Sequence, residues 1–495
     1  MKNMKKLFIV GSGVSGLAAG VYAAKSGFDV TIFEQHNTFG GLSTGWSRKG
    51  YFFEGGMHWL TGSGKNFPLN EVWHEVGALQ ENNPIENRDP LYTVLDGKNN
   101  LKLFRYLDEM KNELLAYSPE DKKIIKKMYR HVKAFSHFYL PVFDVRGCKC
   151  KTPVKPDFIK LMKMLPAVLL VPKLMKTSYI DYVGKFKNEN IKHLLMSVIG
   201  YRYNALSFIY TLGSFASGDC GYPHGGSIRL VKNMAETFEK LGGKICYRSK
   251  VEKIVVENGI TKGIITKDGF LEADAVIVSQ DTRNAIDTLF EKPVHCKWAE
   301  KMRTNLIGEQ NMFICLGVKA DLSKLPYSCI LPLEKPLEYA GLKFNEIRIN
   351  NYANYKDHSP EGCTSITCLL IGDSYDFWKK AKEDGSYKDK KAELARLFVD
   401  AVSQFIPEVK EHLEVTDVST PLTYERYCNS YKGSWMSVWT KHGHQDDYPQ
   451  TVPGISGLYF AGQRIFMPGG LPIACYSGRQ AVQLLCRDTK TIFVR

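Results

Sequence analysis

The sequence predicts an α/β fold that begins with a unit of the Rossmann type and continues as a mixed α+β domain interleaved with it. A glycine-rich turn, GSGVSG, stands between an apolar run and an Ala-rich stretch near the start of the chain. An acidic residue follows the next strand-like run, and two more strand patterns with glycine loops occur near residues 275 and 460. Strand, glycine turn, helix, strand and acid in this order are typical of dinucleotide binding.

The first element expected is a short buried strand at 7–10, followed by the glycines of the turn. Residues 17–26 suit a helix that packs closely on a sheet, and residues 30–33 suit a second strand. Glu34 comes 18 residues after Gly16, near the spacing of about 20 that a Rossmann unit requires. A secretory signal peptide, the other interpretation of this N-terminus, needs about 7–15 apolar residues, and this run ends after four.

Each residue of the turn has a physical task in this interpretation. Gly11 permits the tight turn, Gly13 lets the backbone approach a pyrophosphate, and Gly16 lets the helix lie close to the strand. Free N–H groups and the dipole at the helix start would bind the diphosphate. The Glu34 carboxylate would accept hydrogen bonds from ribose hydroxyls and disfavour a 2′-phosphate, so the sequence predicts FAD or NAD rather than NADP.

Three downstream stretches extend the pattern. "FGGLSTGWSRKGYFFEGGMHWLTG" (39–62) has two glycine pairs around an aromatic hairpin, which suit a chain that passes over a diphosphate and approaches a flavin ring. The alternative is that these glycines only mark hairpins. Residues 222–281 suit a turn, an amphipathic helix, a β-meander and a buried strand at 275–278. "GLYFAGQRIFMPGGLPIACYSGRQAVQLLC" (457–486) suits a strand, a glycine loop and a helix from about Pro472.

Charge and cysteine content restrict the partners. The net charge is +14, and residues 101–200 hold 20 Lys and Arg against 9 Asp and Glu. No nucleic-acid motif accompanies this basic block, so a nucleic-acid partner is not expected. The twelve cysteines are scattered, without CxxC or metal-site spacing. We therefore expect reduced thiols, a cytoplasmic location and no metal site.

The segment near 157–180, "DFIKLMKMLPAVLLVPKLMK" at its centre, is both basic and apolar. Its uncharged part, 164–172, would reach only about 14 Å as a helix, short of the roughly 30 Å of a hydrocarbon core. Two interpretations remain: a short insertion into one leaflet with lysines at the headgroups, or a core helix with solvated ends. The sequence favours the first, and so predicts peripheral contact with the inner face of a membrane.

Taken together, these stretches resemble the phytoene desaturase, carotenoid isomerase and retinol saturase family of amine-oxidase-like flavoproteins. The glycine turn with Glu34, Gly40-Gly41, "GGMH", "YPHGG" and "AGQ…PGGLP…SGR" match in order and approximate spacing over the whole chain. The resemblance implies bound FAD, with Val251 near the adenine and the 462–472 loop near the flavin ring. The residues expected at the cofactor are Gly11, Gly13, Val14, Ser15, Gly16, Glu34, Gln35, Gly40, Gly41, Leu42, Ser43, Gly55, Gly56, Met57, His58, Val251, Gly462, Gln463, Gly470, Leu471 and Pro472.

The same resemblance implies an FAD-dependent oxidoreductase that desaturates, saturates or isomerises C–C double bonds of a long lipid-soluble polyene or unsaturated acyl chain. No second GxGxxG with a following acid occurs, so either the electrons exchange with an external acceptor or donor that the sequence does not identify, or the reaction is redox-neutral. An amine or amino-acid oxidase of the same superfamily is one alternative, although no arginine clamp for a carboxylate can be identified. A non-catalytic flavin-bearing protein that binds membranes or partners is another.

Candidate residues for chemistry and substrate binding are few. His58 lies in the "GGMH" segment and is the catalytic candidate; otherwise it is a satisfied core histidine. The aromatic stretches 201–210 and 424–439 suit the walls of a site for a long apolar or conjugated substrate, with core packing as the alternative.

The order of these motifs predicts two interleaved domains. Residues 1–75, 215–290 and 450–495 are expected to form the FAD-binding domain. Residues 76–214 and 291–449 are expected to form the substrate domain.

Overall fold

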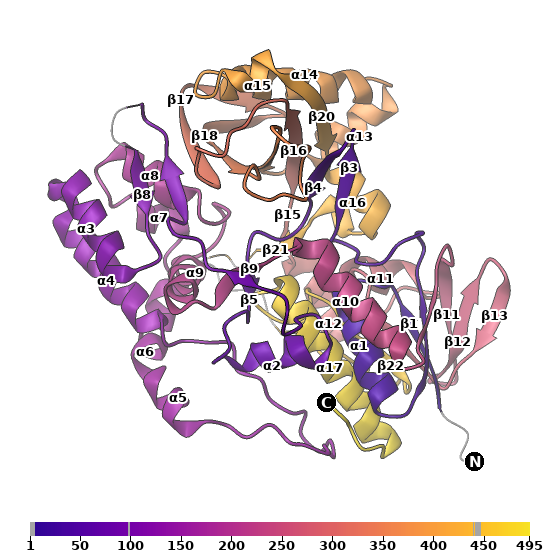
Figure 1. Cartoon of the computed structure of the whole chain (residues 1–495). Coiled ribbons are helices and arrows are strands. Elements are labelled where there is room, and N and C mark those ends of the chain that lie inside the picture. Colours follow the sequence, from indigo (N-terminus) through magenta and orange to yellow (C-terminus); the bar gives the residue numbers. More distant parts are fainter. Residues whose placement is uncertain (1–4, 98–99, 439, 441–446) are drawn as a thin grey trace.

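The computed structural model describes residues 5–97, 100–438, 440 and 447–495 (Figure 1). A parallel five-stranded sheet has the order β10-β2-β1-β14-β22, with Ile9 opposite Ile32 on one side and Ile277 on the other. Its strands are β1 (Lys6–Val10), β2 (Asp29–Phe33), β10 (Lys244–Cys246), β14 (Ala275–Val278) and β22 (Leu458–Phe460). The apolar runs that predicted strands near 7–10, 30–33, 275–278 and 458 thus pair in one sheet.

Both faces of this sheet are covered, because successive residues of β1 point to opposite sides. Leu7 and Ile9 pack in a cluster with the helices of one face, and Phe8 and Val10 pack in a separate cluster on the other. The first face carries α1 (Val14–Lys25), α2 (Pro68–Glu75), α10 (Gly226–Lys240) and α17 (Gly470–Thr489). The second carries β11 (Val251–Glu257), β12 (Ile260–Thr266), β13 (Gly269–Glu272), α11 (Thr282–Thr288) and α12 (Lys297–Asn305).

A seven-stranded sheet, β20-β16-β19-β18-β17-β7-β8, stands beside the first and is antiparallel except where β17 meets β7. Its strands are β7 (Tyr92–Val94), β8 (Leu101–Leu103), β16 (Asn311–Val318), β17 (Ser328–Tyr339), β18 (Leu342–Asn351), β19 (Thr364–Ile371) and β20 (Leu413–Ser419). The helices α13 (Tyr375–Glu383), α14 (Tyr387–Val402) and α15 (Glu408–Glu411) cover one of its faces, at the top of Figure 1.

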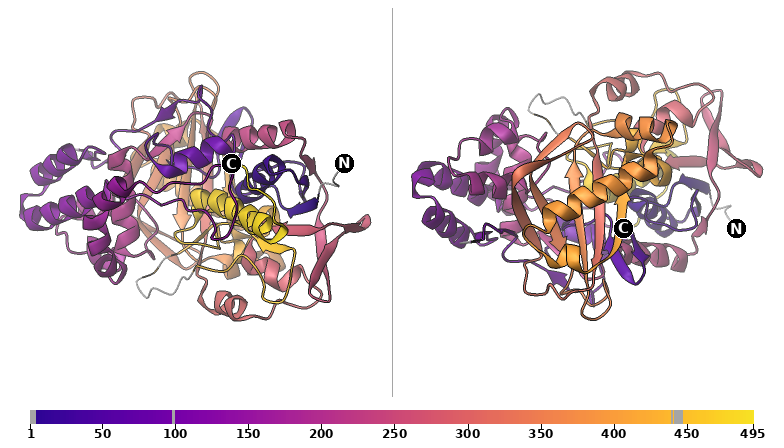
Figure 2. Two further views of the ribbon diagram at one scale, coloured as in Figure 1. Left: turned by 90° about the horizontal axis from the view of Figure 1, so that it is seen from below. Right: turned by 90° about the horizontal axis from the view of Figure 1, so that it is seen from above.

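Helices between β8 and β9 form a third group, which projects away from the parallel sheet in both views of Figure 2. They are α3 (Leu107–Tyr117), η1 (Pro119–Asp121), α4 (Lys122–Phe135), α5 (Phe158–Lys163), α6 (Leu165–Met175), α7 (Tyr179–Val183), α8 (Glu189–Met196) and α9 (Ala205–Ser217). All but α5 and η1 contribute buried side chains to one apolar cluster, which also contains Tyr92 and Val94 of β7.

Short elements connect the three parts. They are the hairpin β3 (Gly45–Arg48) and β4 (Tyr51–Glu54), the strands β5 (Leu60–Thr61), β6 (Ile85–Glu86) and β9 (Cys220–Pro223), the pair β15 (Gly308–Glu309) and β21 (Met436–Ser437), and the helices α16 (Pro421–Cys428) and η2 (Tyr431–Gly433). Tyr51 and Phe53 of the hairpin pack against Phe313 and Cys315 of the seven-stranded sheet. The stretch 1–75 therefore supplies strands to the parallel sheet and a hairpin that packs on the seven-stranded sheet, and the predicted domain boundaries stay a prediction.

Two expected helices differ from the structure at their starts. The helix expected at 17–26 spans Val14–Lys25, and the helix expected from about Pro472 begins at Gly470. In both cases the helix begins within the glycine motif, because glycine accepts the backbone angles needed at the turn: Gly11 has φ +100° and Gly469 has φ +83°.

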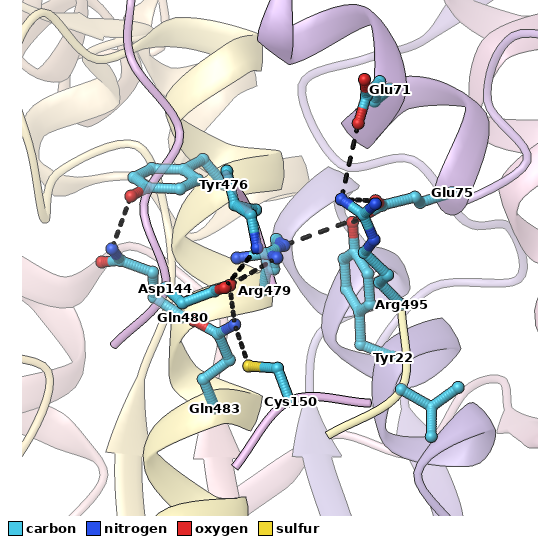
Figure 3. Close-up of polar contacts among 12 residues, drawn as sticks. Tyr22, Glu71, Glu75, Asp144, Cys150, Tyr476, Arg479, Gln480, Gln483 and Arg495 are labelled. Atoms are coloured by element: carbon cyan, nitrogen blue, oxygen red, sulfur yellow. Dashed lines mark hydrogen bonds and ion pairs between the residues drawn. The ribbon is translucent and has the colours of Figure 1, made fainter. Parts of the chain in front are cut away.

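A buried arginine fixes α17 to its surroundings (Figure 3). Arg479 Nη2 lies 2.8 Å from Asp144 Oδ1, and its Nε lies 3.7 Å from Glu75 Oε2 of α2. The guanidinium also stands over the Tyr22 ring of α1 and the Phe493 ring, 5.9 and 5.1 Å from their centroids. One side chain thus connects two neighbouring helices and the loop around residue 144 to α17.

The segment near 157–180 forms the separate helices α5 and α6, whose apolar side chains are mostly exposed. Phe158 is 75% exposed and Leu169 is 72% exposed, and Ile159, Met162, Leu165 and Val168 are exposed as well. Met164, Ala167 and Leu174 are buried. Ala167 and Leu174 belong to the apolar cluster of the helical group, so α6 packs partly on the core, and contact of this segment with a membrane stays a prediction. Among the described residues, no helix combines the length and the apolar character needed to span a bilayer.

Candidate functional site

A large cavity of about 1470 Å³ begins at the glycine turn after β1 and continues between the two sheets to the helical group. Ordinary ligand pockets measure about 300–1,000 Å³. The lining of the cavity in this protein includes the turn, the 39–46 stretch, the 462–472 loop, one face of β18, and Val171 on the inner side of α6. The volume leaves room for a dinucleotide and for a second, apolar molecule beside it.

At the glycine turn the backbone lies open to this cavity. A Cβ added to Gly13 would have one neighbour within 4 Å, the carbonyl oxygen of Gly40 at 3.9 Å. A Cβ on Gly16 would instead overlap the carbonyl of Gly11, so Gly16 permits the close contact of α1 and β1. Space before the first turn of a helix, with free N–H groups around it, fits a diphosphate.

Glu34 lies beside the turn, at the end of β2, and lines the cavity. Its Oε2 accepts hydrogen bonds from Ser12 N at 2.9 Å and Ser12 Oγ at 2.6 Å, and its Oε1 accepts one from His36 N at 2.9 Å. An ionised carboxylate has about four acceptor positions, so one remains for a ribose hydroxyl. Together with the open turn, this carboxylate fits the adenosine half of a flavin dinucleotide.

The structure brings together nearly all of the residues predicted to bind the cofactor. Those that line the cavity are Gly11, Gly13, Val14, Ser15, Glu34, Gln35, Gly40, Gly41, Leu42, Ser43, Gly55, Gly56, His58, Val251, Gly462, Gln463, Gly470, Leu471 and Pro472. Gly16 does not line it, because it packs against β1. Met57 does not line it either, because its side chain is buried in the apolar cluster beneath α1 and α10. Sequence spacing alone did not distinguish Met57 from its neighbours.

The second glycine pair has a packing reason of its own. A Cβ on Gly55 would lie 2.6 Å from the Trp46 ring, and a Cβ on Gly56 would lie 2.7 Å from the carbonyl oxygen of Leu42. Both glycines are therefore needed for the chain to fold back on residues 42–46. Their proximity to a flavin ring stays a prediction.

The 462–472 loop is held in place by hydrogen bonds around the start of α17. Gly462 N donates to Ser477 Oγ at 2.8 Å, and Gln463 Nε2 donates to the carbonyl oxygen of Trp435 at 2.8 Å. Gly470 N donates to Gln463 Oε1 at 3.3 Å. The loop thus presents the positive end of a 20-residue helix to the cavity, where it could stabilise negative charge on a flavin ring.

His58 has polar neighbours from β18 and from the segment that follows β6. Its Nδ1 lies 3.2 Å from Asn350 Nδ2, and its carbonyl oxygen accepts a hydrogen bond from Arg88 Nη1 at 2.9 Å. Burial, and then the positive charges of Arg348 and Arg88, lower the pKa of His58 to about 3. The imidazole is therefore neutral at pH 7 and does not supply a proton as an imidazolium. Its catalytic role stays a prediction, restricted to the neutral ring.

The sequence analysis missed Glu309, a cavity-lining carboxyl that is 1% exposed. Its Oε1 has no hydrogen-bond partner among the described residues. Burial raises its pKa to about 8, the positive charge of Arg202 opposes the rise, and the negative charge of Asp373 adds to it. Glu309 pairs with Met436 across β15 and β21, next to Trp435, which contacts the 462–472 loop. The pairing of β15 with β21 thus places the protonated carboxyl of Glu309 close to the 462–472 loop.

Two arginines at the site were not among the residues predicted from the sequence. Arg88 and Arg348 both face a small second cavity beside His58, and Arg348 also lines the large one. The only sequence signal was the alternation of "FNEIRINN" at 344–351, which indicates a strand with one polar face but not which face meets a cavity.

The predicted aromatic stretches do supply walls of the large cavity. Tyr201, Tyr203 and Tyr210 come from the first stretch, and Tyr424, Tyr427 and Trp435 from the second. Trp439, in the second stretch, lies outside the described residues. Val198, Ile199 and Leu206 complete an apolar surface between β18 and the helical group. In the described part of the chain, no three His, Cys, Asp or Glu side chains are grouped to hold a metal ion.

Comparison with known sequences finds relatives over most of the chain. A family model described as flavin containing amine oxidoreductase matches residues 14–486. The chain is 22% identical to a 4,4′-diapophytoene desaturase of Methylomonas sp, over 100% of this chain and 97% of the relative. It is 23% identical to an all-trans-retinol 13,14-reductase of Danio rerio, over 93% and 82%. It is 22% identical to a chloroplastic prolycopene isomerase of Daucus carota, over 97% and 80%.

Solved structures resemble the whole fold. An oxidoreductase from Methanosarcina mazei has a TM-score of 0.63 at 18% identity, covering 97% of this chain and 100% of the other. A putrescine oxidase variant has a TM-score of 0.63 at 13% identity, covering 98% and 99%. At these identities the similarity concerns the fold.

Proposed function

The chain belongs to the flavin containing amine oxidoreductase family, and on that premise we propose that it acts on a long, lipid-soluble polyene or unsaturated acyl chain. The observation that carries this proposal is the cavity, which continues from the glycine turn into a wall of aromatic and aliphatic side chains and reaches α6. Such a surface binds an extended apolar molecule by burial of area and by contact with aromatic faces.

The enzyme is an FAD-dependent oxidoreductase. Bound flavin supplies hydride transfer to or from a carbon atom of the substrate. We propose that Gly13 and the start of α1 hold the diphosphate, that Glu34 binds the ribose, and that the 462–472 loop faces the flavin ring. The protonated Glu309 can hold or release a proton near this ring, which each of the reactions considered below could use.

For the reaction, we propose a class of chemistry rather than a single conversion. The relatives named above are a desaturase, a reductase and an isomerase of conjugated substrates. Loss of a hydride from an unactivated C–H bond needs neighbouring double bonds to delocalise the charge, which a conjugated chain provides. We place desaturation first, then saturation and isomerisation. An amine substrate is the alternative to be tested, since a putrescine oxidase shares the fold.

We further propose that the substrate arrives from a membrane through α5 and α6. Val171 of α6 lines the cavity, whereas Leu165 and Leu169 of the same helix are exposed. Exposed apolar side chains beside lysines suit insertion into one leaflet, with the ammonium groups at the headgroups. All twelve cysteines are free, which supports a reducing compartment and hence the cytoplasmic face of the membrane.

The test is anaerobic incubation of the flavin-loaded enzyme with panels of carotenoids, retinoids, unsaturated fatty acids and amines, while the visible flavin absorbance is recorded. We expect a polyene to bleach the oxidised flavin or to be converted after chemical reduction of the flavin. Bleaching by amines and by no lipid would overturn the proposal. A flavin that no compound reduces or reoxidises would favour the non-catalytic alternative.

A further inference from the structure

Strand β18 places charged side chains in an otherwise apolar part of the large cavity. Glu346 and Arg348 line the cavity, and Asn350, the next residue on the same face, contacts His58. Ile347 and Ile349, on the opposite face, are fully buried in the cluster under α14. The alternation of the strand therefore directs Arg348 toward the substrate space rather than into the core.

Arg348 has no carboxylate partner among the described residues. Its Nη1 donates to the carbonyl oxygen of Ser197 at 2.6 Å, and its guanidinium lies 5.7 Å from the centroid of the Tyr92 ring. A guanidinium has five N–H donors, and this hydrogen bond uses one. By contrast, the buried Arg464 lies 3.0 Å from Asp281 Oδ2 and the buried Arg479 lies 2.8 Å from Asp144 Oδ1.

Arg348 shares its surroundings with Glu346, Arg88 and His58. Glu346, on the same face of β18, directs its carboxylate to His193, with Oε2 2.9 Å from Nδ1, and forms no ion pair with Arg348 among the described residues. Arg88, which lines the small cavity with Arg348 and His58, has Glu86 at 3.9 Å. His58 itself carries no charge at pH 7, because burial and the two arginines lower its pKa. Of the two arginines beside His58, Arg88 therefore has a carboxylate within 4 Å, and Arg348 has none among the described residues.

We propose that Arg348 binds a carboxylate at the end of the long-chain substrate, so that the substrate is an unsaturated or polyene acid rather than a hydrocarbon. This inference rests on the proposed function. The planar guanidinium matches a carboxylate through two parallel hydrogen bonds. The apolar chain would then extend along Val198, Ile199 and Leu206, which line the same cavity.

The two simpler occupants fit less well. A hydrocarbon would cover Arg348 without giving its remaining donors a partner, and an unpaired polar group in an apolar site is unfavourable. A small amino acid would pair with Arg348 but would leave most of the aromatic and aliphatic wall unfilled.

The experiment compares a fluorescent conjugated tetraene fatty acid with its methyl ester, each titrated into the flavin-loaded enzyme at about pH 8, where the acid is ionised. We expect the wild type to bind the acid about tenfold or more tightly than the ester. Arg348→Gln should remove that preference by weakening acid binding alone, and Arg348→Lys should keep part of it. Lys382→Gln, which removes a charge from an exposed residue lining the same cavity, should leave it unchanged.

The outcomes separate the two proposals. Equal binding of acid and ester by the wild type would overturn the carboxylate site and leave the polyene substrate standing. If a folded, flavin-loaded Arg348→Gln variant still prefers the acid, a residue other than Arg348 binds the substrate carboxylate. Binding of neither acid nor ester would overturn the proposed function itself. Unchanged ester affinity in the variant shows that its cavity is intact.

Discussion

At Gly13 the backbone faces a space that no side chain fills. Its φ of −70° is accessible to any residue, so a larger residue there meets the cofactor rather than backbone strain. We expect Gly13→Ala to weaken FAD binding and Gly13→Val to abolish it, while the far-ultraviolet circular dichroism stays unchanged. The measurement is the FAD released on denaturation per mole of protein. A Gly13→Val protein with a full complement of FAD would contradict the diphosphate assignment.

Glu309 is the acid whose protonation most affects the site. Its folded pKa, about 8, exceeds that of the unfolded chain, so the native state binds more protons between pH 5 and 8. Arg202, Asp373, Tyr201 and Tyr203 are the ionisable groups that face it. The free energy of unfolding of the wild type should therefore fall, relative to Glu309→Gln, as the pH rises through this range.

The steepest part of that difference should approach about 1.4 kcal/mol per pH unit. Urea denaturation of both proteins at several pH values measures it. Asp219, whose pKa burial also raises to about 8, is present in both proteins and cancels. Infrared spectroscopy provides an independent check, since the protonated-carboxyl absorption at pH 7 should be weaker in the variant by the contribution of Glu309, while that of Asp219 remains in both proteins. Parallel stability curves and identical spectra would show an ionised Glu309.

At the scale of the element, α17 is joined to its neighbours by the ion pairs of Arg479. Despite burial, hydrogen bonds from Val154 N, Arg479 and Gln483 lower the pKa of Asp144, so its carboxylate is ionised at neutral pH. Arg479→Met would leave this carboxylate and that of Glu75 without their shared partner. We expect a loss of about 3 kcal/mol in the free energy of unfolding, measured with urea at neutral pH.

The matched control for α17 is Arg487→Met on the same helix. Arg487 is paired with Asp488 at 2.9 Å, but its side chain is 40% exposed. An exposed pair contributes about 0–1 kcal/mol, so this substitution should change the stability little. Equal effects of the two substitutions would mean that the network in Figure 3 does not support the helix.

A separate prediction concerns α5 and α6, because their apolar side chains are exposed to solvent. We expect the wild type to sediment with anionic liposomes at low salt, and Ile159→Glu with Leu169→Glu to abolish sedimentation. Phe270→Glu is the control, since Phe270 is an exposed aromatic residue of β13, outside this segment. If the wild type remains in the supernatant, the proposed membrane contact of α5 and α6 is wrong. The proposal that the cavity binds a long apolar substrate would not be affected.

At the scale of the whole molecule, the parallel sheet cannot form from one continuous segment. The strands β1 and β2 come from the start of the chain, β10 and β14 from its middle, and β22 from its end. Limited proteolysis should therefore yield no stable fragment that ends near residue 150, because such a fragment lacks three of the five strands. Mass spectrometry of the resistant products decides this, and a stable 1–150 fragment would refute the interleaved arrangement.

The sequence by itself determined the local elements and the cofactor class. Gly11, Gly13 and Gly16 are set by backbone geometry within a few residues, and Glu34 follows at a spacing fixed by one helix and one strand. Such signals depend on neighbours along the chain, so a single sequence contains them. For the same reason the sequence does not show that the Met57 side chain turns away from the cavity, since the direction of one side chain within a glycine-rich stretch depends on what packs against it.

Only the tertiary structure decided what lies at the end of the substrate cavity. Glu309 and Arg348 are far from the glycine motifs in sequence, and each belongs to a strand whose polar residues look like ordinary surface positions. The burial of Glu309, its unpartnered Oε1 and the position of Arg348 in the same cavity depend on contacts between distant parts of the chain, such as the hydrogen bond from Arg348 to Ser197. The same holds for α5 and α6, where packing, not hydrophobicity, determined which apolar side chains are left exposed.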